Sequence, residues 1–207
     1  MDKYVITIAR TFGSGGKSVG KLLAKELGIK YYDREILRMA SDDSGISEGL
    51  FGEADEKSKS KVFFGFAKKS HNPRLITPDS EGFVSDDNLF NYQSKIIRKL
   101  ADEESCVIMG RCADHILKDN KNAIRVFCYA PFEDCVRREM EVNQHSEKES
   151  RKLITKTDKE RASYYKYYTG AEWSDARHYD LCINTSSLRN EEILELIKSF
   201  IEVIKNR

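Results

Sequence analysis

The chain has 207 residues, of which 40% are hydrophobic and 33% charged, so it is long enough to bury one sizeable globular core. Its 35 basic and 34 acidic side chains leave a net charge of +1, which excludes a global field for holding a nucleic acid or an anionic membrane as partner. Five cysteines without a C-x-x-C pair, and no apolar run of membrane-spanning length, predict a cytoplasmic protein without a disulfide framework or zinc site.

Five short apolar runs predict β-strands. They cover residues 4–9, 29–32, 106–109, 124–129 and 180–184. Continuous apolar strands that alternate with helices are typical of a parallel sheet covered on both faces. We therefore predict an α/β fold of three layers, α/β/α, with a five-stranded parallel sheet whose ligands bind at the carboxyl ends of the strands.

Helical segments follow most of these strands. The first has a one-sided apolar face and ends at Gly28, a residue type that favours helix C-termini. Another begins at Pro131, and the next opens with Ser146-x-x-Glu149, the pattern of a capping box. The last begins near Asn190 and carries a wide apolar stripe, which predicts a helix packed on the sheet.

Residues 42–88 differ in character from the rest of the chain. They are rich in Ser, Asp, Gly and Lys and show no sustained periodicity, apart from a patch that contains Phe63, Phe64 and Phe66. A structureless loop of this length is unusual inside a domain, so we predict either a mobile functional insert or a poorly ordered segment. The phenylalanine patch is of the kind that often marks a contact surface.

Residues 10–18 read R-T-F-G-S-G-G-K-S and match the P-loop pattern G-x-x-x-x-G-K-[ST], except that Thr11 replaces the first glycine. Glycines let successive backbone N–H groups turn toward phosphates, and the following helix adds the positive end of its dipole. Because the loop lies between a buried strand and an amphipathic helix, it predicts a site for ATP. The expected ATP-binding residues are Gly13, Ser14, Gly15, Gly16, Lys17, Ser18 and Val19.

Two side chains of this loop have distinct expected roles. Lys17 would reach the β- and γ-phosphates, and the Ser18 hydroxyl would be a ligand of the Mg²⁺ ion that accompanies ATP. Arg111 follows an apolar strand directly, so it is expected at the same edge of the sheet, where a planar guanidinium suits phosphate binding. A surface ion pair between Arg111 and Asp114 is the alternative.

The segment ITIARTFGSGGKSVGKLLAKELGIKYYDREIL, residues 6–37, resembles the cytidylate kinase-like branch of the nucleoside monophosphate kinases. Three later segments agree in order: VIMGR at 107–111, D-x-x-R at 158–161 and YDLCINTSSL at 179–188. This resemblance implies ATP-dependent transfer of a phosphoryl group to CMP, dCMP or a similar nucleoside monophosphate.

The resemblance also implies a domain organisation. Residues 1–207 would form a single P-loop kinase domain, with an acceptor-binding or mobile insert at 42–88 and a helical lid region at 131–172. The oligomeric state is left open.

Four acceptor-site residues are implied by the same resemblance: Asp33, Arg111, Asp158 and Arg161. Lys17, Asp33, Arg111 and Arg161 form the expected catalytic set. The chain departs from the family pattern around Arg111, where Met109 and Cys112 stand in place of two aspartates. At these two positions the polar contacts to cytosine that the resemblance implies are therefore partly missing.

Several alternatives remain open for single residues. One alternative is that Asp33 merely caps the helix that begins near Arg34 and has no catalytic role. Another is that it serves as general base, if the acceptor is a hydroxyl. Most of the basic residues in 137–166 are expected on a solvated helix face, with Arg137 and Arg138 as weaker catalytic candidates. The tyrosines at 164–168 and Trp173 could stack on a base, although helix packing is the favoured use.

Two further functions compete with the first. One is a P-loop kinase for another small metabolite, which the residues at 109 and 112 keep possible. The other is a nucleotide-binding regulatory protein without turnover, supported by Thr11 and by the absence of an aspartate after the third strand.

Overall fold

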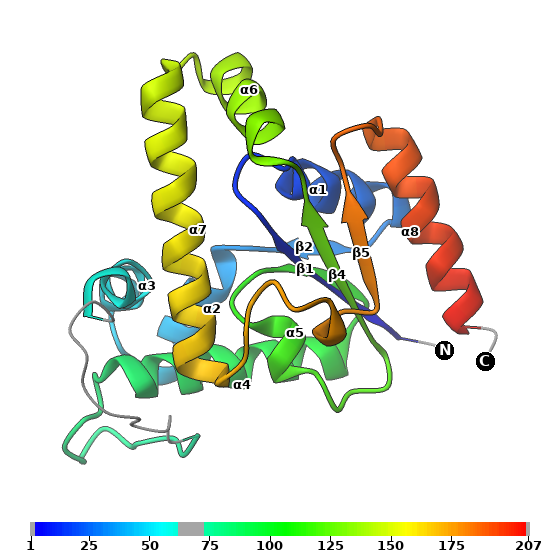
Figure 1. Ribbon diagram of the computed structural model, residues 1–207. Helices are drawn as coiled ribbons and strands as arrows, with labels where there is room; N and C mark the ends of the chain where they lie inside the picture. Colours follow the sequence, from blue (N-terminus) through cyan, green and yellow to red (C-terminus); the bar gives the residue numbers. More distant parts are fainter. Residues whose placement is uncertain (1–2, 62–72, 206–207) are drawn as a thin grey trace.

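The computed structural model describes residues 3–61 and 73–205. Five parallel strands form one sheet in the order β2-β3-β1-β4-β5 (Figure 1). The strands are β1 Val5–Arg10, β2 Lys30–Tyr32, β3 Cys106–Met109, β4 Ala123–Tyr129 and β5 Leu181–Asn184. Each one starts and ends within one residue of its expected range, so the predicted five-stranded parallel sheet is confirmed.

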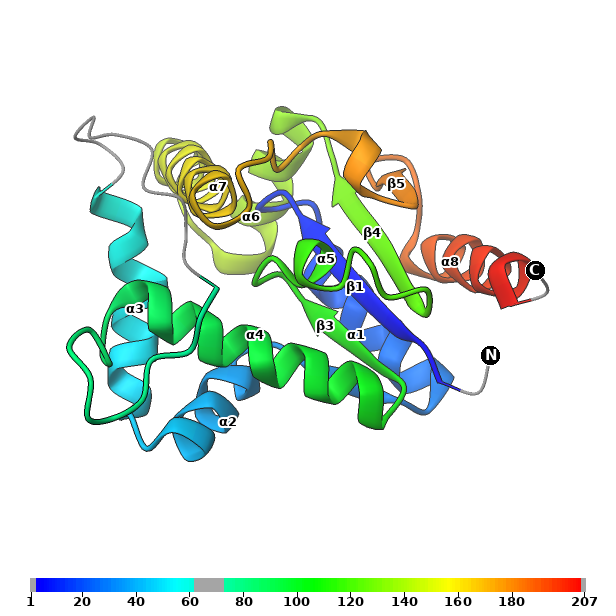
Figure 2. The ribbon, with the colours of Figure 1, turned by 90° about the horizontal axis from the view of Figure 1, so that it is seen from below.

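Helices cover both faces of the sheet and make the three predicted layers (Figure 2). One face packs against α1 Gly16–Leu27 and α8 Asn190–Lys205, and the other against α2 Glu35–Ser44, α4 Asp86–Glu103 and α5 Ala113–Ile116. Successive strand residues point to opposite faces. Val5 therefore joins the α2–α4 side of the core and Ile6 the α1–α8 side.

Helices α6 Phe132–Asn143 and α7 Glu147–Thr169 stand side by side near the carboxyl end of β4 (Figure 1). Pro131 occupies the N-cap position of α6, as expected. The capping box of α7 is present: Ser146 Oγ accepts from the Glu149 amide, and the Glu149 side chain accepts from the Ser146 amide. The capping box of α7 satisfies backbone N–H groups that an α-helix leaves unpaired at its start.

An aromatic cluster fixes the far end of α7 against α4. The rings of Phe90 and Tyr168 stack with centroids 4.0 Å apart, and the Tyr165 hydroxyl donates to Asp114 Oδ2 over 2.6 Å. Trp173, in the turn before the short helix η1 Ala176–His178, is buried in the same cluster. Helix packing, the favoured use of Tyr165, Tyr168 and Trp173, is therefore confirmed.

The range 42–88 holds more regular structure than its composition indicates. Its first residues complete α2, and α3 Glu48–Lys61 follows. Residues 73–85 then lead without helix or strand to the start of α4, where Asn88 bonds the backbone of Ile76 through both its amide nitrogen and its oxygen. The expectation of irregular structure is thus wrong for α3. Phe63, Phe64 and Phe66 lie outside the described residues.

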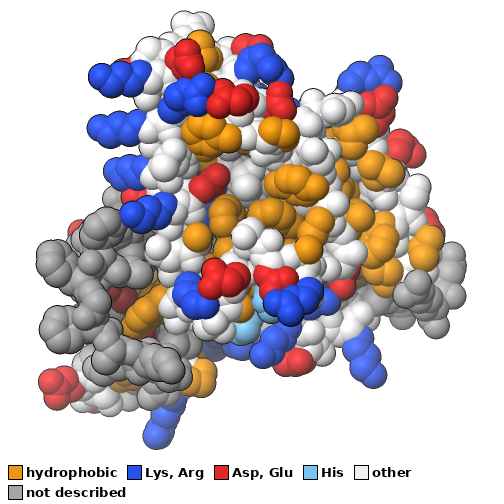
Figure 3. Space-filling view, in the orientation of Figure 1, with side chains coloured by type: hydrophobic (Ala, Val, Ile, Leu, Met, Phe, Trp, Pro, Cys, Tyr) orange, Lys and Arg blue, Asp and Glu red, His pale blue; other side chains and the backbone are white. Residues whose placement is uncertain are grey.

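The surface of α7 separates two kinds of residues. Figure 3 shows Lys and Arg side chains in a row along the outer side of this helix, and Lys148, Lys152 and Lys156 are exposed. This confirms the solvated basic face that the sequence predicts. The positions on the inner side of α7 are partly or fully buried and face the rest of the molecule. Within the described ranges, none of the helices is both long and apolar enough to cross a membrane.

Candidate active site

The phosphate loop joins β1 to α1 in a tight turn. Gly13 and Gly15 have φ of 78° and 80°, a region that glycine enters without strain. A Cβ on Gly16 would lie 2.7 Å from the Arg10 Cβ, so that position leaves no room for a side chain. In the described part of the chain the amides of Gly15, Lys17 and Ser18 have no hydrogen-bond acceptor. The loop is therefore neither extended nor closed off by protein groups, and it presents N–H groups suited to an anion.

Hydrogen bonds from residues far along the chain, and one within the loop itself, fix the backbone of the phosphate loop. The Thr185 hydroxyl donates to the Ser14 carbonyl over 2.7 Å, and Arg138 Nη1 donates to the Gly13 carbonyl over 2.9 Å. The Ser14 hydroxyl donates to the carbonyl of Thr11. Arg138 thus braces the loop, and Arg137 forms an exposed ion pair with Asp134. Neither arginine lines the cavity described next.

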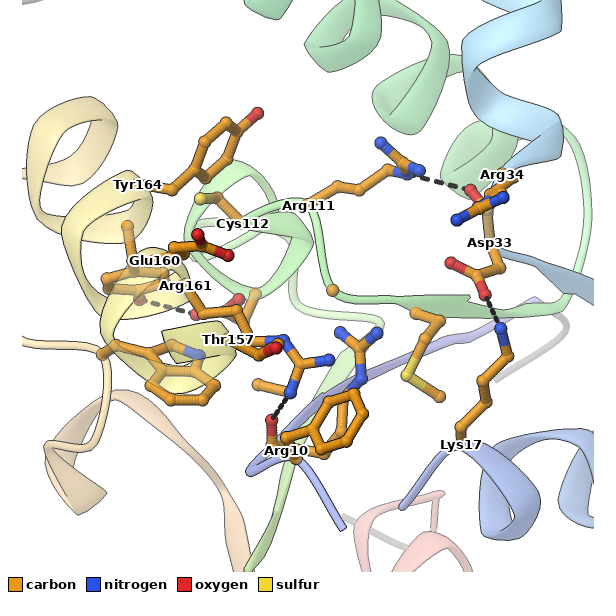
Figure 4. Close-up of a pocket in the computed structure, with 17 residues that line it drawn as sticks. Arg10, Lys17, Asp33, Arg34, Arg111, Cys112, Thr157, Glu160, Arg161 and Tyr164 are labelled. Atoms are coloured by element: carbon orange, nitrogen blue, oxygen red, sulfur yellow. Dashed lines mark hydrogen bonds and ion pairs between the residues drawn. The ribbon is translucent and has the colours of Figure 1, made fainter. Parts of the chain in front are cut away.

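A cavity of about 350 Å³ opens beside the loop, between the carboxyl ends of β1 and β3 and the inner side of α7 (Figure 4). Its lining contains Arg10, Lys17, Asp33, Arg34, Arg111, Cys112, Asp114, Thr157, Glu160, Arg161 and Tyr164, with apolar residues between them. Four of the predicted site residues therefore meet in one cavity: Lys17, Asp33, Arg111 and Arg161.

Lys17 and Asp33 form an ion pair at the mouth of this cavity. Lys17 Nζ lies 2.8 Å from Asp33 Oδ2, and the two side chains are 54% and 15% exposed. Burial alone would raise the pKa of Asp33, but Lys17, Arg10 and Arg111 together hold that pKa below its usual value. Asp33 is thus ionised at neutral pH. Its side chain does not cap α2, whose N-cap residue is Arg34 without a side-chain bond, so the capping alternative is wrong.

Arg111 is aimed into the cavity by an unusual backbone. Gly110, Arg111 and Cys112 all have positive φ, of 68°, 57° and 54°. Two successive non-glycine residues in this region are uncommon and cluster at functional sites. Arg111 Nε donates to the Asp33 carbonyl over 2.9 Å, and Nη1 lies 3.4 Å from Gln93 Oε1. These bonds set the guanidinium beside Asp33.

Asp158 and Arg161 bring α7 into contact with the phosphate loop. Asp158 Oδ1 accepts from the Phe12 amide over 2.8 Å and from Arg161 Nη1 over 3.2 Å. Arg161 Nη1 also donates to the Arg10 carbonyl over 3.1 Å. Burial and then the like charge of Arg10 lower the pKa of Arg161 to about 10. Arg161 therefore remains charged at neutral pH, in a position where an anion would stabilise it.

Arg10 is a site residue that the sequence reasoning missed. It ends β1, and its side chain enters the cavity across Gly110, where a Cβ would lie only 2.5 Å from Arg10 Nη1. Glycine is therefore favoured at position 110 both by the positive φ and by the close approach of the Arg10 side chain. The sequence feature that could have identified Arg10 is its charge at the end of an apolar strand, directly before the phosphate loop.

The remaining predicted residues take different places. Ser18 is exposed on the first turn of α1, where its hydroxyl is open to a ligand, while the Val19 side chain lies in the core and its amide donates to Gly15. Met109 and Cys112 are both buried. Within the described ranges, no cluster of three or more His, Cys, Asp or Glu residues could hold a metal ion. A Mg²⁺ ion here would depend on oxygens of the nucleotide as well as on Ser18.

A phosphate loop after the first strand of a parallel three-layer sheet, facing a cavity lined with cations, defines the class of P-loop kinases. Residues 5–187 match the model of the cytidylate kinase-like family, and the chain belongs to that family. The expectation drawn from residues 6–37 is thereby confirmed.

Individual relatives agree with this family. The chain is 24% identical to a cytidylate kinase of Methanopyrus kandleri over 98% of its own length and 95% of the relative's. A solved structure of an uncharacterized protein from Eubacterium ventriosum is 30% identical, with a TM-score of 0.70 and coverage of 97% and 99%. Shikimate kinase from Bacteroides thetaiotaomicron shares the fold at 14% identity, with a TM-score of 0.54 and coverage of 96% and 98%.

Proposed function

We propose that this kinase transfers the γ-phosphoryl group of ATP to a nucleoside monophosphate, with CMP or dCMP as the acceptor. One observation carries the proposal: Lys17 of the phosphate loop and Arg111 of the β3 end line the same cavity, and both bond to Asp33. A cation that faces the donor phosphates and a guanidinium for an acceptor phosphate are therefore held on one residue, Lys17 by the Asp33 carboxylate and Arg111 by the Asp33 backbone carbonyl.

The loop amides and Lys17 would bind the β- and γ-phosphates of ATP. Bound Mg²⁺ would supply charge neutralisation on those phosphates, with Ser18 as its protein ligand. The chain's own part is to orient the polyphosphate and to exclude water. Because phosphoryl transfer needs mainly positioning and electrostatic stabilisation, these residues suffice for that half of the reaction.

Arg111 would hold the phosphate of the acceptor, with Arg10 and Arg34 on the same side of the cavity. A monophosphate has a second pKa of about 6 and is already a nucleophile at neutral pH. It needs no general base. The role we assign to Asp33 is therefore to orient Lys17 and Arg111 through the bonds already described.

We assign the lid to α6 and α7, within the predicted range 131–172. The contacts of Asp158 with the Phe12 amide and of Arg161 with the Arg10 carbonyl bring α7 against the loop. Arg161 would neutralise charge on the transferring phosphoryl group once the lid is closed. We keep the cytoplasm as the proposed compartment, because all five cysteines are free thiols.

A coupled assay of ADP release tests the acceptor. The purified chain would be offered ATP, Mg²⁺ and, one at a time, CMP, dCMP, UMP, AMP, GMP, shikimate and gluconate. We expect the highest kcat/KM with CMP or dCMP. Turnover of none of the monophosphates would contradict the proposal, and ATP binding without turnover on any acceptor would favour a non-catalytic nucleotide-binding protein.

The second candidate is a kinase for a hydroxyl-bearing metabolite, favoured by the apolar Met109 and Cys112 beside Arg111. A hydroxyl acceptor would need a general base, and Asp33 is a carboxylate at the cavity mouth. The two candidates differ in their response to Asp33→Asn. A hydroxyl kinase would lose the acidic limb of its pH–rate profile, whereas a monophosphate kinase would keep the shape of its profile.

A further inference from the structure

The two walls of the cavity carry different chemistry (Figure 4). The wall at the sheet edge is cationic, with Arg10, Lys17, Arg34 and Arg111. The wall on α7 contains Thr157, Glu160, Arg161 and Tyr164. Positions that are three, four and seven residues apart share one helix face. The cavity therefore offers a phosphate-binding end and, across from it, a face with a hydroxyl, a carboxylate and an aromatic ring.

Glu160 stands out on the α7 wall because its carboxylate lacks good partners. Its side chain is only 13% exposed, and its ion pair is with Lys156 Nζ at a distance of 3.9 Å. In the part of the chain that the structure describes, it accepts no hydrogen bond. A carboxylate removed from water without donors is costly, so a ligand that brings a donor into the cavity would be stabilised there.

The other carboxylates of the cavity are already engaged. Asp33 is paired with Lys17, and Asp114 accepts from the Tyr165 hydroxyl. Met109 and Cys112, which flank Gly110 and Arg111, are not carboxylates. Glu160 is thus the lining carboxylate with the most capacity left to accept a hydrogen bond from an acceptor.

We propose that Glu160 determines which base the acceptor carries, by accepting a hydrogen bond from an exocyclic amino group. This inference rests on the proposed function, in which the acceptor phosphate lies on the cationic wall. Cytosine presents an amino donor at position 4, where uracil presents a carbonyl oxygen that a carboxylate repels. A site built around a hydrogen bond discriminates strongly against an analogue that leaves its polar group unpaired. Tyr164, one turn further along α7, offers a ring to the base.

The test compares CMP with UMP in one assay. Wild type, Glu160→Gln, Lys156→Met and Glu147→Gln are assayed with ATP, Mg²⁺ and each monophosphate, and the ratio of the two kcat/KM values is taken for each variant. Any loss of folded protein cancels in this ratio. Lys156→Met removes the only ion pair of Glu160 that the structure records, and Glu147→Gln removes an exposed carboxylate from the same helix.

We expect the kcat/KM of wild type to be roughly tenfold to hundredfold higher with CMP than with UMP, because a hydrogen bond to a charged group contributes a free energy of that size. Glu160→Gln should bring the ratio close to one and raise the absolute kcat/KM for UMP, because an amide can also donate to a carbonyl oxygen. Both controls should keep the wild-type ratio.

Three results would overturn the inference. These are a wild type that uses UMP as well as CMP, a Glu160→Gln ratio within twofold of wild type, and a Lys156→Met ratio changed as much as that of Glu160→Gln. Wild type without turnover of any monophosphate would instead remove the proposed function, and this inference with it.

Discussion

The phosphate loop and the α7 wall face each other across the cavity but are specified differently. The loop consists of consecutive residues, and main-chain amides and glycines give it its shape. The α7 wall consists of side chains, and it reaches the loop through contacts such as that between Phe12 and Asp158, 146 residues apart. Main-chain amides serve any polyphosphate, whereas a helix face can change residue by residue. In the proposed function, donor binding would therefore depend on the loop, and the choice of the acceptor's base on α7.

The largest effect should come from the loop side. Lys17→Ala removes the charge aimed at the donor phosphates and leaves Asp33 without its partner. We expect kcat to fall by roughly 10²- to 10³-fold, the usual loss for a preorganised charge-stabilising group. ADP release under saturating substrates measures it. Lys21→Ala, an exposed lysine on the same helix, is the control and should keep full activity. A loss below tenfold for Lys17→Ala would refute the assigned role.

The next largest effect should come from Arg10, whose side chain lies in the cavity beside Gly110. Arg10→Met should lower kcat by about 100-fold, by removing a guanidinium from the transferring charge. Gly110→Ala should act in part through the same residue, since its Cβ would displace the Arg10 side chain. The double variant should then lose less than the product of the two single losses. If the kcat loss of the double variant equalled the product of the two single losses, Gly110 would act only through its backbone conformation and not through the Arg10 side chain.

The support of α7 can be weakened without touching the cavity. Ser146→Ala removes the capping-box hydroxyl, and the free energy of unfolding should fall by about 1 kcal/mol. For a chain of this size the melting temperature should fall by about 2–4 °C. The kcat per folded molecule should stay at the wild-type value. A marked fall in kcat would mean that the start of α7 acts directly in the reaction.

The smallest effect concerns pH. The pKa of Asp33 in the folded state lies below its ordinary value of 3.8. Its ion pair therefore adds its full stability at pH values above the pKa that Asp33 has in the unfolded chain. This stability is lost as the pH falls through the lower, folded-state pKa. Because Lys17 is 54% exposed, we expect no more than about 1 kcal/mol. Denaturant unfolding of wild type and Asp33→Asn from neutral to acidic pH should show a steeper acid loss for wild type, and parallel curves would contradict it.

The sequence predicts the sheet and the phosphate loop well, because both depend on local patterns. Apolar runs mark all five strands, and the glycine spacing marks the loop. The pattern fails at α3, whose 14 residues include few apolar positions and carry no one-sided stripe. That helix packs through Phe51 and Ala54 against α2 and α4, which is tertiary information.

Side-chain roles that depend on distant partners could not be predicted. Arg10 enters the cavity only because Gly110, directly after β3, leaves space for it. Glu160 lies in the charged run Asp158-Lys159-Glu160-Arg161, where a solvated face is the natural interpretation. The packing of α7 turns part of that run inward. Arg138, a weaker catalytic candidate, instead donates to the Gly13 carbonyl and does not line the cavity.

The bonds that fix the phosphate loop reach the end of the sheet. The Thr185 hydroxyl, just after β5, bonds the Ser14 carbonyl, and Arg138 donates to the Gly13 carbonyl. The loop's sequence is complete by Ser18, yet its supports are synthesised much later. A nascent chain whose Thr185 has not yet emerged from the ribosome would contain the motif, but its loop would lack the bonds that fix its conformation for binding a nucleotide. Transplanting the first strand, loop and helix into another scaffold would meet the same obstacle.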